Sequence, residues 1–564
     1  AHPFLLGRCL CLAGRYARQI PPGMISRFLE AAINGLQENQ PMCITISSVR
    51  AIYWFCEAST IPNSNTVDVV RSHLGPIFLG LFGLVARQLS TEVLTLVMET
   101  FAILIGLDKD FTASVETKIC PLAIAVFVKY HSDPEILSIC QDIFKELSEN
   151  PQCIGPLQSR LIPTLISMMN INRLDKSVDE GTRGVALDVL QVLVQFSPVR
   201  NLSGALVDTA FPAACHCILN SDDNATLQSG GELIRTYLSI GARQVIDHRD
   251  NEGRTGLHYI LQIVAQLLNP QSSEFTATFV GRLVTTLIRK VGNTLGENLD
   301  LLLKAVLSKM QRAETLTVMQ SLLMIYAHLI NTEFEAVLNF LSSVPGPTGQ
   351  SALVFVLTEW VARQHLFFGS YDRKVTTVAL SKILEHGVTN DDARLNEIMV
   401  KGDEIFSSHQ DGIRTRSKTQ SQPSQWTSVP ILVKIFKLII NEISSDIEAG
   451  CARKSQETDD SPADEDEDND DENNCEDNNQ QDDIFINPGN QTDIWRIEEE
   501  DPEEEEDPDL LQDSIYHLNL NQYLRDFVIN FSTHHCFLMF TQHLNPTERK
   551  VLNNLNIHPT FIQS

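Results

Sequence analysis

The sequence predicts an all-α protein built as a solenoid, a superhelix of antiparallel helix pairs, with one disordered acidic loop. Apolar residues recur every three or four positions through most of its 564 residues, and strand-like alternation is almost absent. Helix-start signals followed by apolar helices recur at a nearly constant spacing. A period of this length is typical of helical-repeat arrays, in which each helix pair buries its apolar face against the next pair.

The amphipathic helices are clearest in the second half of the chain. One helix is predicted by the stripe of Leu299, Leu302, Leu303, Val306, Leu307 and Met310, and the next by Leu316, Met319, Leu323, Tyr326 and Ile330. After Pro430, we expect Leu432, Phe436, Ile439 and Ile443 to face the core, with Lys434, Lys437 and Asn441 on the opposite side.

The repeat period follows from aligning segments that share a helix start. Anchor positions are Val49, Met98, Gln141, Leu187, Gly230 and Met319, which are 49, 43, 46, 43 and 89 residues apart. The last spacing is about two periods. Capping signals support several helix starts: Asp133 before Pro134, the Ser221–Asn224 stretch, and Asn545 with Glu548 in a capping-box pattern.

These signals divide the chain into three parts. Residues 1–450 are predicted to form the solenoid, interrupted by a short loop at Val344–Gln350 and a basic loop at 401–425. Residues 455–513 form the acidic loop, and residues 514–564 return to helical patterning and close the solenoid. The opening AHPFLLGRCL resembles the middle of a helix, so we expect a fragment whose N-terminal repeats are missing.

The acidic loop concentrates nearly all of the net charge. Between Glu457 and Asp513 there are 27 acidic residues and one basic residue, Arg496, so this stretch carries −26 of the total −29. Such a segment cannot offset the cost of ordering its backbone, about 1 to 2 kcal/mol per residue, and is expected to be disordered. It is either a solubilising spacer or a segment that attracts a strongly basic partner electrostatically. In the second case Ile484–Ile486 and Ile494–Trp495 are apolar docking points.

The basic loop contains a compact cluster, Gly412–Lys418, in polar surroundings. It is either a contact for an acidic surface, a signal like those for nuclear localisation, or a solvated loop that pairs transiently with the acidic run.

The remaining composition excludes several classes. Apolar residues make up 43% of the chain, but no run approaches the roughly 18 residues of a membrane span, and no secretory signal opens the sequence. Twelve cysteines without framework spacing fit reduced thiols of a cytosolic or nuclear protein. Phosphate-loop, dinucleotide, nucleophile-elbow and zinc-helix motifs are absent, so we expect no enzyme, cofactor or metal. Cys215–Cys217 and His534–Cys536 are interpreted as packing residues, because neighbours on one helix diverge.

Several sequence segments, spread over essentially the whole chain, resemble the karyopherin-β (importin-β) family of nuclear import receptors. They are TEVLTLVMETF, FTASVETKICP, SDDNATLQSGGE, SSEFTATFVGRLVTTLI, LSKMQRAETLTVMQSL, RQHLFFG, DGIRTRSK and HLNPTERKVL. The resemblance implies a HEAT-repeat superhelix that binds basic cargo, passes nuclear pores by binding Phe-Gly nucleoporins, and responds to the GTPase Ran. Implied cargoes are core histones, with ribosomal proteins and actin.

The resemblance also implies which residues bind cargo or Ran. Cargo or Ran would meet the basic loop at Arg414, Arg416 and Lys418. Cargo would meet the acidic loop at Asp464, Glu465, Asp466, Glu467, Asp468, Asp470, Asp471, Glu472, Ile484, Phe485, Ile486, Trp495, Glu498, Glu499, Glu500, Asp501, Glu503, Glu504, Glu505, Glu506 and Asp507. The family's main Ran-GTP site lies in N-terminal repeats that this chain is expected to lack.

We therefore expect a monomer that shuttles between cytoplasm and nucleus and binds no nucleic acid directly. The alternatives are a static HEAT-repeat scaffold, a histone chaperone without transport activity, and an exportin, since repeats alone do not give a direction of transport.

Overall fold

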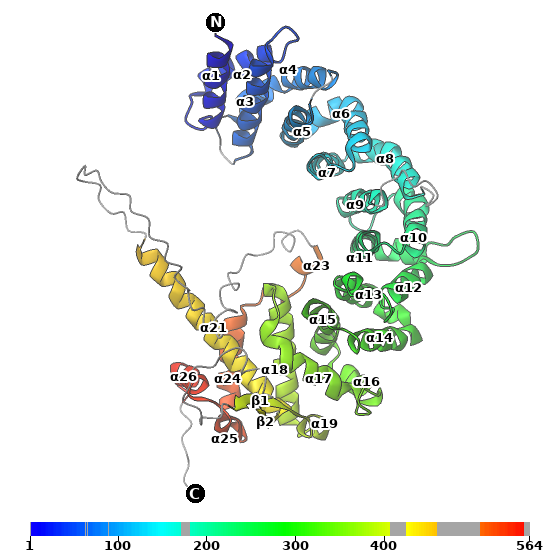
Figure 1. Ribbon diagram of the computed structural model, residues 1–564, viewed down its shortest axis with the longest axis vertical. Coiled ribbons are helices and arrows are strands. Elements are labelled where there is room, and N and C mark those ends of the chain that lie inside the picture. The colour runs from blue at the N-terminus through cyan, green and yellow to red at the C-terminus, as the bar shows by residue number, and fades with distance from the viewer. Residues whose placement is uncertain are drawn as a thin grey trace, which may run out of the picture. The chain divides into compact units, whose positions relative to one another are not determined.

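The computed structural model describes residues 2–61, 64, 66–87, 90–170, 181–405, 425–459 and 508–557. Helices dominate these residues, as predicted (Figure 1). The chain divides into two compact units, Ala1–Leu299 and Asp300–Ser564, which we describe separately.

Unit 1 is a double row of helices. The inner row lies on the inside of the arc that this unit forms in Figure 1, and each of its helices packs on the next. The inner row consists of α1 (Pro3–Arg15), α3 (Met42–Thr60), α5 (Thr91–Gly106), α7 (Pro134–Ser148), α9 (Thr182–Gln195), α11 (Asn224–Asp247) and α13 (Val280–Leu295). The outer row consists of α2 (Pro22–Gly35), α4 (Val67–Val85), α6 (Lys109–Tyr130), α8 (Ile154–Met169), α10 (Phe211–Leu219) and α12 (Gly256–Leu267). A π-helical turn, Ala205–Ala210, leads into α10, and a 3₁₀ turn, Phe275–Ala277, precedes α13.

The predicted repeat period is confirmed by where its anchors lie. Val49, Met98, Gln141, Leu187 and Gly230 fall on the successive helices α3, α5, α7, α9 and α11. The double spacing that follows Gly230 is explained by α13, which has no anchor of its own.

The predicted helix caps are also present. The Asp133 carboxylate accepts hydrogen bonds from the backbone N–H groups of Glu135 and Ile136 at 3.2 and 3.3 Å, and Asp223 accepts one from Thr226 at 2.8 Å. Caps of this kind stabilise a helix by about 1 kcal/mol.

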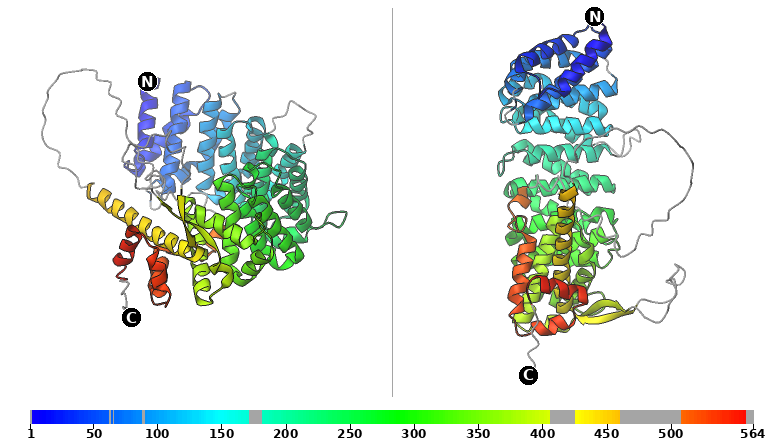
Figure 2. Two further views of the ribbon diagram at one scale, coloured as in Figure 1. Left: turned by 60° about the horizontal axis from the view of Figure 1, so that its bottom comes forward. Right: turned by 90° about the vertical axis from the view of Figure 1, so that its left-hand side faces the viewer.

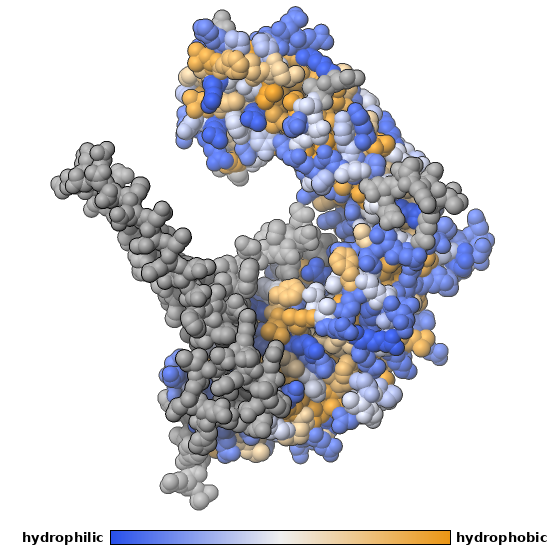
Figure 3. Space-filling view, in the orientation of Figure 1, coloured by the Kyte–Doolittle hydropathy of each residue, from blue (hydrophilic) through white to orange (hydrophobic). Residues whose placement is uncertain are grey.

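The core of unit 1 lies between the two rows. Phe78 of α4 packs edge-on against Phe101 and Phe111, and the buried Tyr237 hydroxyl donates to the Leu206 carbonyl at 3.0 Å. At Gly231 of α11 an added Cβ would lie 2.1 Å from the ring of Phe279, so glycine permits this close approach. At the other end of the unit α1 exposes apolar side chains, Phe4 and Leu5 among them, and Figure 3 shows hydrophobic surface over the first helices.

Two outer helices, α4 and α6, are long and apolar enough to cross a membrane by length and composition alone. The sequence prediction, which counted only unbroken apolar runs, did not identify them. Each contains an internal proline, Pro76 or Pro121, and each packs against three neighbouring helices of the double row. Core helices of helical-repeat proteins meet the same criterion, so this finding is weak evidence for a span.

Unit 2 is organised around one long helix, α21 (Ile431–Asp459), which packs on α17, α18, α24 and α26. The elements that precede α21 are α14 (Glu297–Met310, which crosses the unit boundary), α15 (Leu316–Thr332), α16 (Phe334–Ser343), α17 (Ala352–Arg363), a 3₁₀ turn (Gln364–Leu366), α18 (Ser370–Thr389), α19 (Ala393–Asn396), β1 (Met399–Ile405) and β2 (Gln425–Pro430). Those that follow are α23 (Pro508–Leu511), α24 (Leu520–Ser532), α25 (Phe537–Gln542) and α26 (Pro546–Asn554).

The predicted stripes of α14 and α15 are largely buried; Leu299 and Leu316, at the helix starts, are half-buried. The loop at Val344–Gln350 lies, as predicted, between α16 and α17.

The structure differs from the prediction at the ends of the 401–425 loop. Met399–Ile405 and Gln425–Pro430 pair as antiparallel strands, with Val400 opposite Val429 and an irregularity between Lys401 and Glu404 (Figure 2). These strands were missed because each is short, and because Gly402 and the charged residues around it hide the alternation of apolar and polar positions.

The prediction was also wrong for Lys437. This residue is 3% exposed rather than facing solvent. The periodicity of α21 gave no hint of this, because the side chain that buries Lys437 comes from α26, more than one hundred residues further along the chain.

Candidate functional site

The sequence-predicted site residues lie outside the described residues. Arg414, Arg416 and Lys418 fall within 406–424, between β1 and β2, and the named carboxylates and apolar residues of the acidic loop fall within 460–507. The structure does describe the elements from which both segments leave unit 2, and a second acidic feature in unit 1 that the sequence did not reveal.

The acidic segment starts and ends on ordered elements of unit 2. It follows α21, whose last residue is Asp459, and it returns through α23. Beyond α23 the chain is held on α18, where the Tyr371 hydroxyl donates to Asp513 Oδ2 at 2.8 Å and Lys374 Nζ donates to the Tyr516 carbonyl at 2.8 Å. The hydroxyls of Ser381 and Tyr523 are also hydrogen-bonded. Both ends of the segment are therefore attached to the same unit.

The basic segment leaves from the β1–β2 hairpin, which projects from unit 2 (Figure 2). The base of the hairpin contacts α21, where Asp403 Oδ2 accepts a hydrogen bond from Lys437 Nζ at 2.7 Å. The same ammonium contacts Glu548 Oε2 of α26 at 3.1 Å and donates to the His543 carbonyl at 3.0 Å. We call Lys437 with these three acceptors the Lys437 cluster.

Unit 1 carries three carboxylates along its inner row, Glu57 of α3, Glu99 of α5 and Glu135 of α7, which we call the acidic row. Burial raises the pKa of Glu99, and repulsion from Glu135 raises it further. The pKa of Tyr53 is raised by burial and then by the negative charges of Glu57 and Glu99. Electrostatic interactions thus connect Glu99 of α5 with Glu135 of α7, and Tyr53 of α3 with both Glu57 and Glu99.

The surroundings of the acidic row are partly aromatic. Tyr53 of α3, whose pKa responds to the charges of Glu57 and Glu99, is half-buried. A surface that combines carboxylates with aromatic faces is suited to lysine and arginine side chains, which pair with the first and stack on the second.

The sequence contained a signal for the acidic row that we did not use. Glu57 and Glu99 are 42 residues apart, which is close to one repeat, whereas Glu99 and Glu135 are only 36 residues apart. Stacked repeats place residues one period apart side by side. A search for like charges at the repeat spacing would have paired Glu57 with Glu99 but would not have found Glu135.

An apolar groove lies on the outer row of unit 1, between α6 and α8. It measures about 500 Å³ and is lined by Pro121, Ile124, Ala125 and Val128 of α6, with Lys129 and Arg160 at its edge. Arg160 forms an ion pair with the buried Glu116. Val128 is 45% exposed, so this apolar surface is open to solvent.

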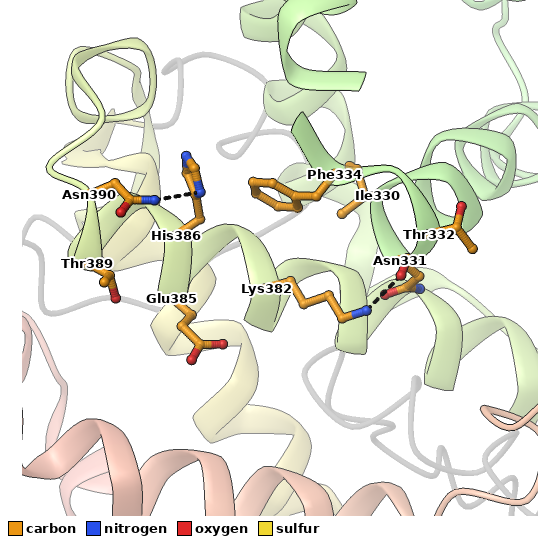
Figure 4. A pocket seen from close by; sticks show the side chains of 9 residues that line it. All are labelled: Ile330, Asn331, Thr332, Phe334, Lys382, Glu385, His386, Thr389 and Asn390. Carbon is orange, nitrogen blue, oxygen red and sulfur yellow. Dashed lines mark hydrogen bonds between the residues drawn. The ribbon is translucent and has the colours of Figure 1, made fainter. Parts of the chain in front are cut away.

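A mixed pocket of about 360 Å³ lies in unit 2 between α15, α16 and α18 (Figure 4). Lys382 Nζ donates to the Asn331 carbonyl at 2.9 Å, and burial lowers the pKa of Lys382. The His386 ring lies 4.7 Å from that of Phe334 and bonds to Asn390 and Asp392. Because these polar groups mostly bond to one another, we interpret the pocket as part of the helix junction.

The two Cys/His clusters differ in arrangement: Cys215–Cys217 lie on α10, whereas His534–Cys536 lie in the turn between α24 and α25 with their side chains close together. Cys215 and Cys217 are buried while His216 is exposed, and burial raises the pKa of both thiols. His534 Nδ1 lies 3.0 Å from Cys536 Sγ. Among the described residues no group of three or more His, Cys, Asp or Glu side chains is placed to hold a metal ion.

Comparison with known proteins agrees with this architecture. Residues 185–556 match the model of a family described as importin-11-like, TPR repeats. Importin-9 of Drosophila melanogaster is 37% identical over 558 residues, which is 98% of this chain and 52% of that protein. Importin subunit beta-5 of Schizosaccharomyces pombe is 24% identical over 78% of this chain and 42% of its own length. The chain thus spans about half the length of the relatives it matches.

Among solved structures, the exportin Cse1 in its cargo-free, cytoplasmic state superimposes with a TM-score of 0.56 at 12% identity. The match covers 96% of this chain and 48% of the exportin. This likeness concerns the fold, and it confirms the predicted all-α HEAT-repeat solenoid.

Proposed function

Because the chain belongs to the importin-11-like family, we propose that it is part of a nuclear transport receptor that binds and shields basic cargo and carries it through the nuclear pore into the nucleus. The cargoes proposed are core histones first, and then ribosomal proteins and actin. The receptor shuttles between cytoplasm and nucleus, and Ran-GTP controls its cargo through a main site in repeats outside this chain.

The observation that carries this proposal is the distribution of negative charge. The Glu457–Asp513 stretch holds −26 of the net −29, so the rest of the chain is nearly neutral. Against that neutral background, the acidic row is a local concentration of carboxylates on the ordered inner row of unit 1. Proteins that bind DNA do so through lysines and arginines, and the same residues would bind these carboxylates.

The two acidic features suit different steps of capture. The field of the acidic segment accelerates encounter with a cationic protein and decays over about 8 to 10 Å at physiological salt. The acidic row is fixed on successive helices, so it can contact particular side chains of the cargo. Together they would keep a basic cargo from binding nucleic acid during transport.

Passage through pores requires a surface for Phe-Gly repeats, and the α6–α8 groove is the candidate. Its apolar floor suits the phenylalanine side chains, and its position on the outer row leaves the inner row free for cargo.

Ala125→Glu places a charge in the groove. Lys118→Glu, at an exposed position of the same helix outside the groove, is the control. We expect only Ala125→Glu to reduce binding of a Phe-Gly peptide, by about tenfold.

The cargo proposal is tested by measuring affinity for a core histone dimer over a range of salt concentrations. Residues 460–507 are replaced by a Gly-Ser linker, which leaves α21, α23 and the Tyr371–Asp513 contact in place. A second variant keeps the length of the segment but changes its acidic residues to Asn and Gln. If charge is the cause, both variants lose affinity and salt dependence to the same extent. If neither variant binds more weakly than the wild type, the segment has no part in cargo binding.

The same preparations separate a receptor from the alternatives. A static scaffold would be isolated with a stable enzyme partner, whereas a receptor exchanges its cargo. A histone chaperone without transport activity would bind histones and fail to bind Phe-Gly peptides. Cargo affinity of the full-length protein with and without Ran-GTP distinguishes import from export.

A further inference from the structure

The Lys437 cluster brings four segments of unit 2 to one buried ammonium group. Lys437 comes from α21, Asp403 from β1, His543 from the turn before α26, and Glu548 from the first turn of α26. The three contacts are 2.7, 3.0 and 3.1 Å long, so the ammonium, which has three protons to donate, is surrounded by three acceptors.

The acceptors differ in how firmly each is held. The side chain of Glu548 is 2% exposed, and its Oε2 also accepts from the backbone N–H of Asn545 at 2.9 Å in the capping box of α26. The Asp403 side chain is 54% exposed. An ion pair with one partner largely in water is weak, whereas breaking a buried pair is costly.

The backbone of the hairpin is shaped to make the Asp403 contact. The ladder is irregular between Lys401 and Glu404, and the Asp403 N–H donates to Thr427 Oγ1 at 2.8 Å inside this irregularity. At Gly402 an added Cβ would lie 2.3 Å from the same Thr427 oxygen, so only glycine fits there. This irregularity lets the largely exposed Asp403 side chain reach Lys437 of α21.

The charge of a neighbouring lysine also favours the contact between Asp403 and Lys437. Lys434, one turn before Lys437, is half-buried, and burial is the main cause that lowers its pKa. The charges of Asp403 and Glu548 raise that pKa, while the charge of Lys437 lowers it. Lys434 and Lys437 are thus balanced by Asp403 and Glu548, and without Asp403 the two lysines would face a single carboxylate.

We propose that Asp403 is a releasable latch: it holds the β1–β2 hairpin against α21, and it can detach while Lys437, Glu548 and the His543 carbonyl stay together. Release leaves the C-terminal helices in place and frees the strands whose connecting residues carry the basic cluster. The hairpin thus has a docked and an undocked position, and the exposed pair sets the balance between them.

Hydrogen–deuterium exchange of the whole chain tests the latch. In Asp403→Ala we expect the amides of 399–405 and 425–430 to exchange about three- to tenfold faster, while those of α26 keep their protection. Asp403→Asn, which keeps an acceptor oxygen, should give a smaller increase. Lys401→Gln, an exposed charge change on the same strand, is the matched control and should give none.

Two results would overturn the proposal. Unchanged exchange in both strands of Asp403→Ala would mean that the contact does not hold the hairpin. Faster exchange in α26 by the same factor would mean that Asp403 belongs to the C-terminal core and does not detach separately.

Discussion

The acidic row of unit 1 and the Lys437 cluster of unit 2 are both built from charged side chains, but their charges are arranged in opposite ways. In the acidic row, carboxylates of like charge lie on the successive helices α3, α5 and α7, and the pKa of Glu99 is raised by burial and by Glu135. In the Lys437 cluster, each buried charge faces an opposite charge, and the ammonium has three acceptors.

This difference separates charge that serves the fold from charge that is available to a partner. A buried, fully paired group stabilises the packing around it and is costly to break. The ionised form of Glu99, which is repelled by Glu135, opposes folding, and groups with a perturbed pKa concentrate at functional sites. The Lys437 cluster therefore contributes to the packing of unit 2, whereas we propose that the acidic row is available to cargo.

The largest effect is expected for Lys437→Met. This change leaves Glu548 buried without its ammonium partner, and we expect it to destabilise the C-terminal part of unit 2 by about 3 kcal/mol. Chemical unfolding followed through exchange of α24–α26 measures the loss. The double variant with Glu548→Gln no longer leaves a buried carboxylate without its partner, and only the largely exposed Asp403 loses Lys437, so part of the stability should return. Equal stability of Lys437→Met and the wild type would show that the cluster is not structural.

A smaller effect is expected at the point where the acidic segment returns. Tyr371→Phe removes the hydroxyl that donates to Asp513, which costs about 1 to 2 kcal/mol for a hydrogen bond to a charged group. Exchange should accelerate in residues 508–518 and remain unchanged in α18. Ser381→Ala, which removes the bond to Tyr523 instead, indicates how local the effect is.

The smallest effect concerns stability against pH. Because the pKa of Glu99 is raised in the folded protein, its ionised form opposes folding at neutral pH. Glu99→Gln should therefore stabilise unit 1 at pH 7, by less than about 1 kcal/mol because solvent screens the group. The gain should disappear as pH falls through the raised pKa toward the ordinary value of a glutamate. A variant that is less stable than the wild type at pH 7 would mean that Glu99 is structurally paired.

The same contrast explains what the sequence could predict. Helix periodicity, the repeat spacing and the capping box at Asn545 and Glu548 depend on residues close together in the chain or at a regular period, and these predictions were correct. Lys437 was misplaced because its carboxylate partners are 34 and more than one hundred residues away. The hairpin was missed because its two short strands, 399–405 and 425–430, pair across a long connecting segment. The acidic row became visible only when the helices were stacked.

We propose that the acidic row binds cargo and is not required by the fold. The most direct test combines Glu57→Gln, Glu99→Gln and Glu135→Gln and compares the variant with the wild type in two measurements. One is the thermal stability of unit 1, and the other is affinity for a core histone dimer at several salt concentrations. We predict that stability is unchanged or higher, while affinity falls about tenfold or more with a shallower salt dependence. Lower stability with unchanged affinity would contradict the account, because the row would then be structural.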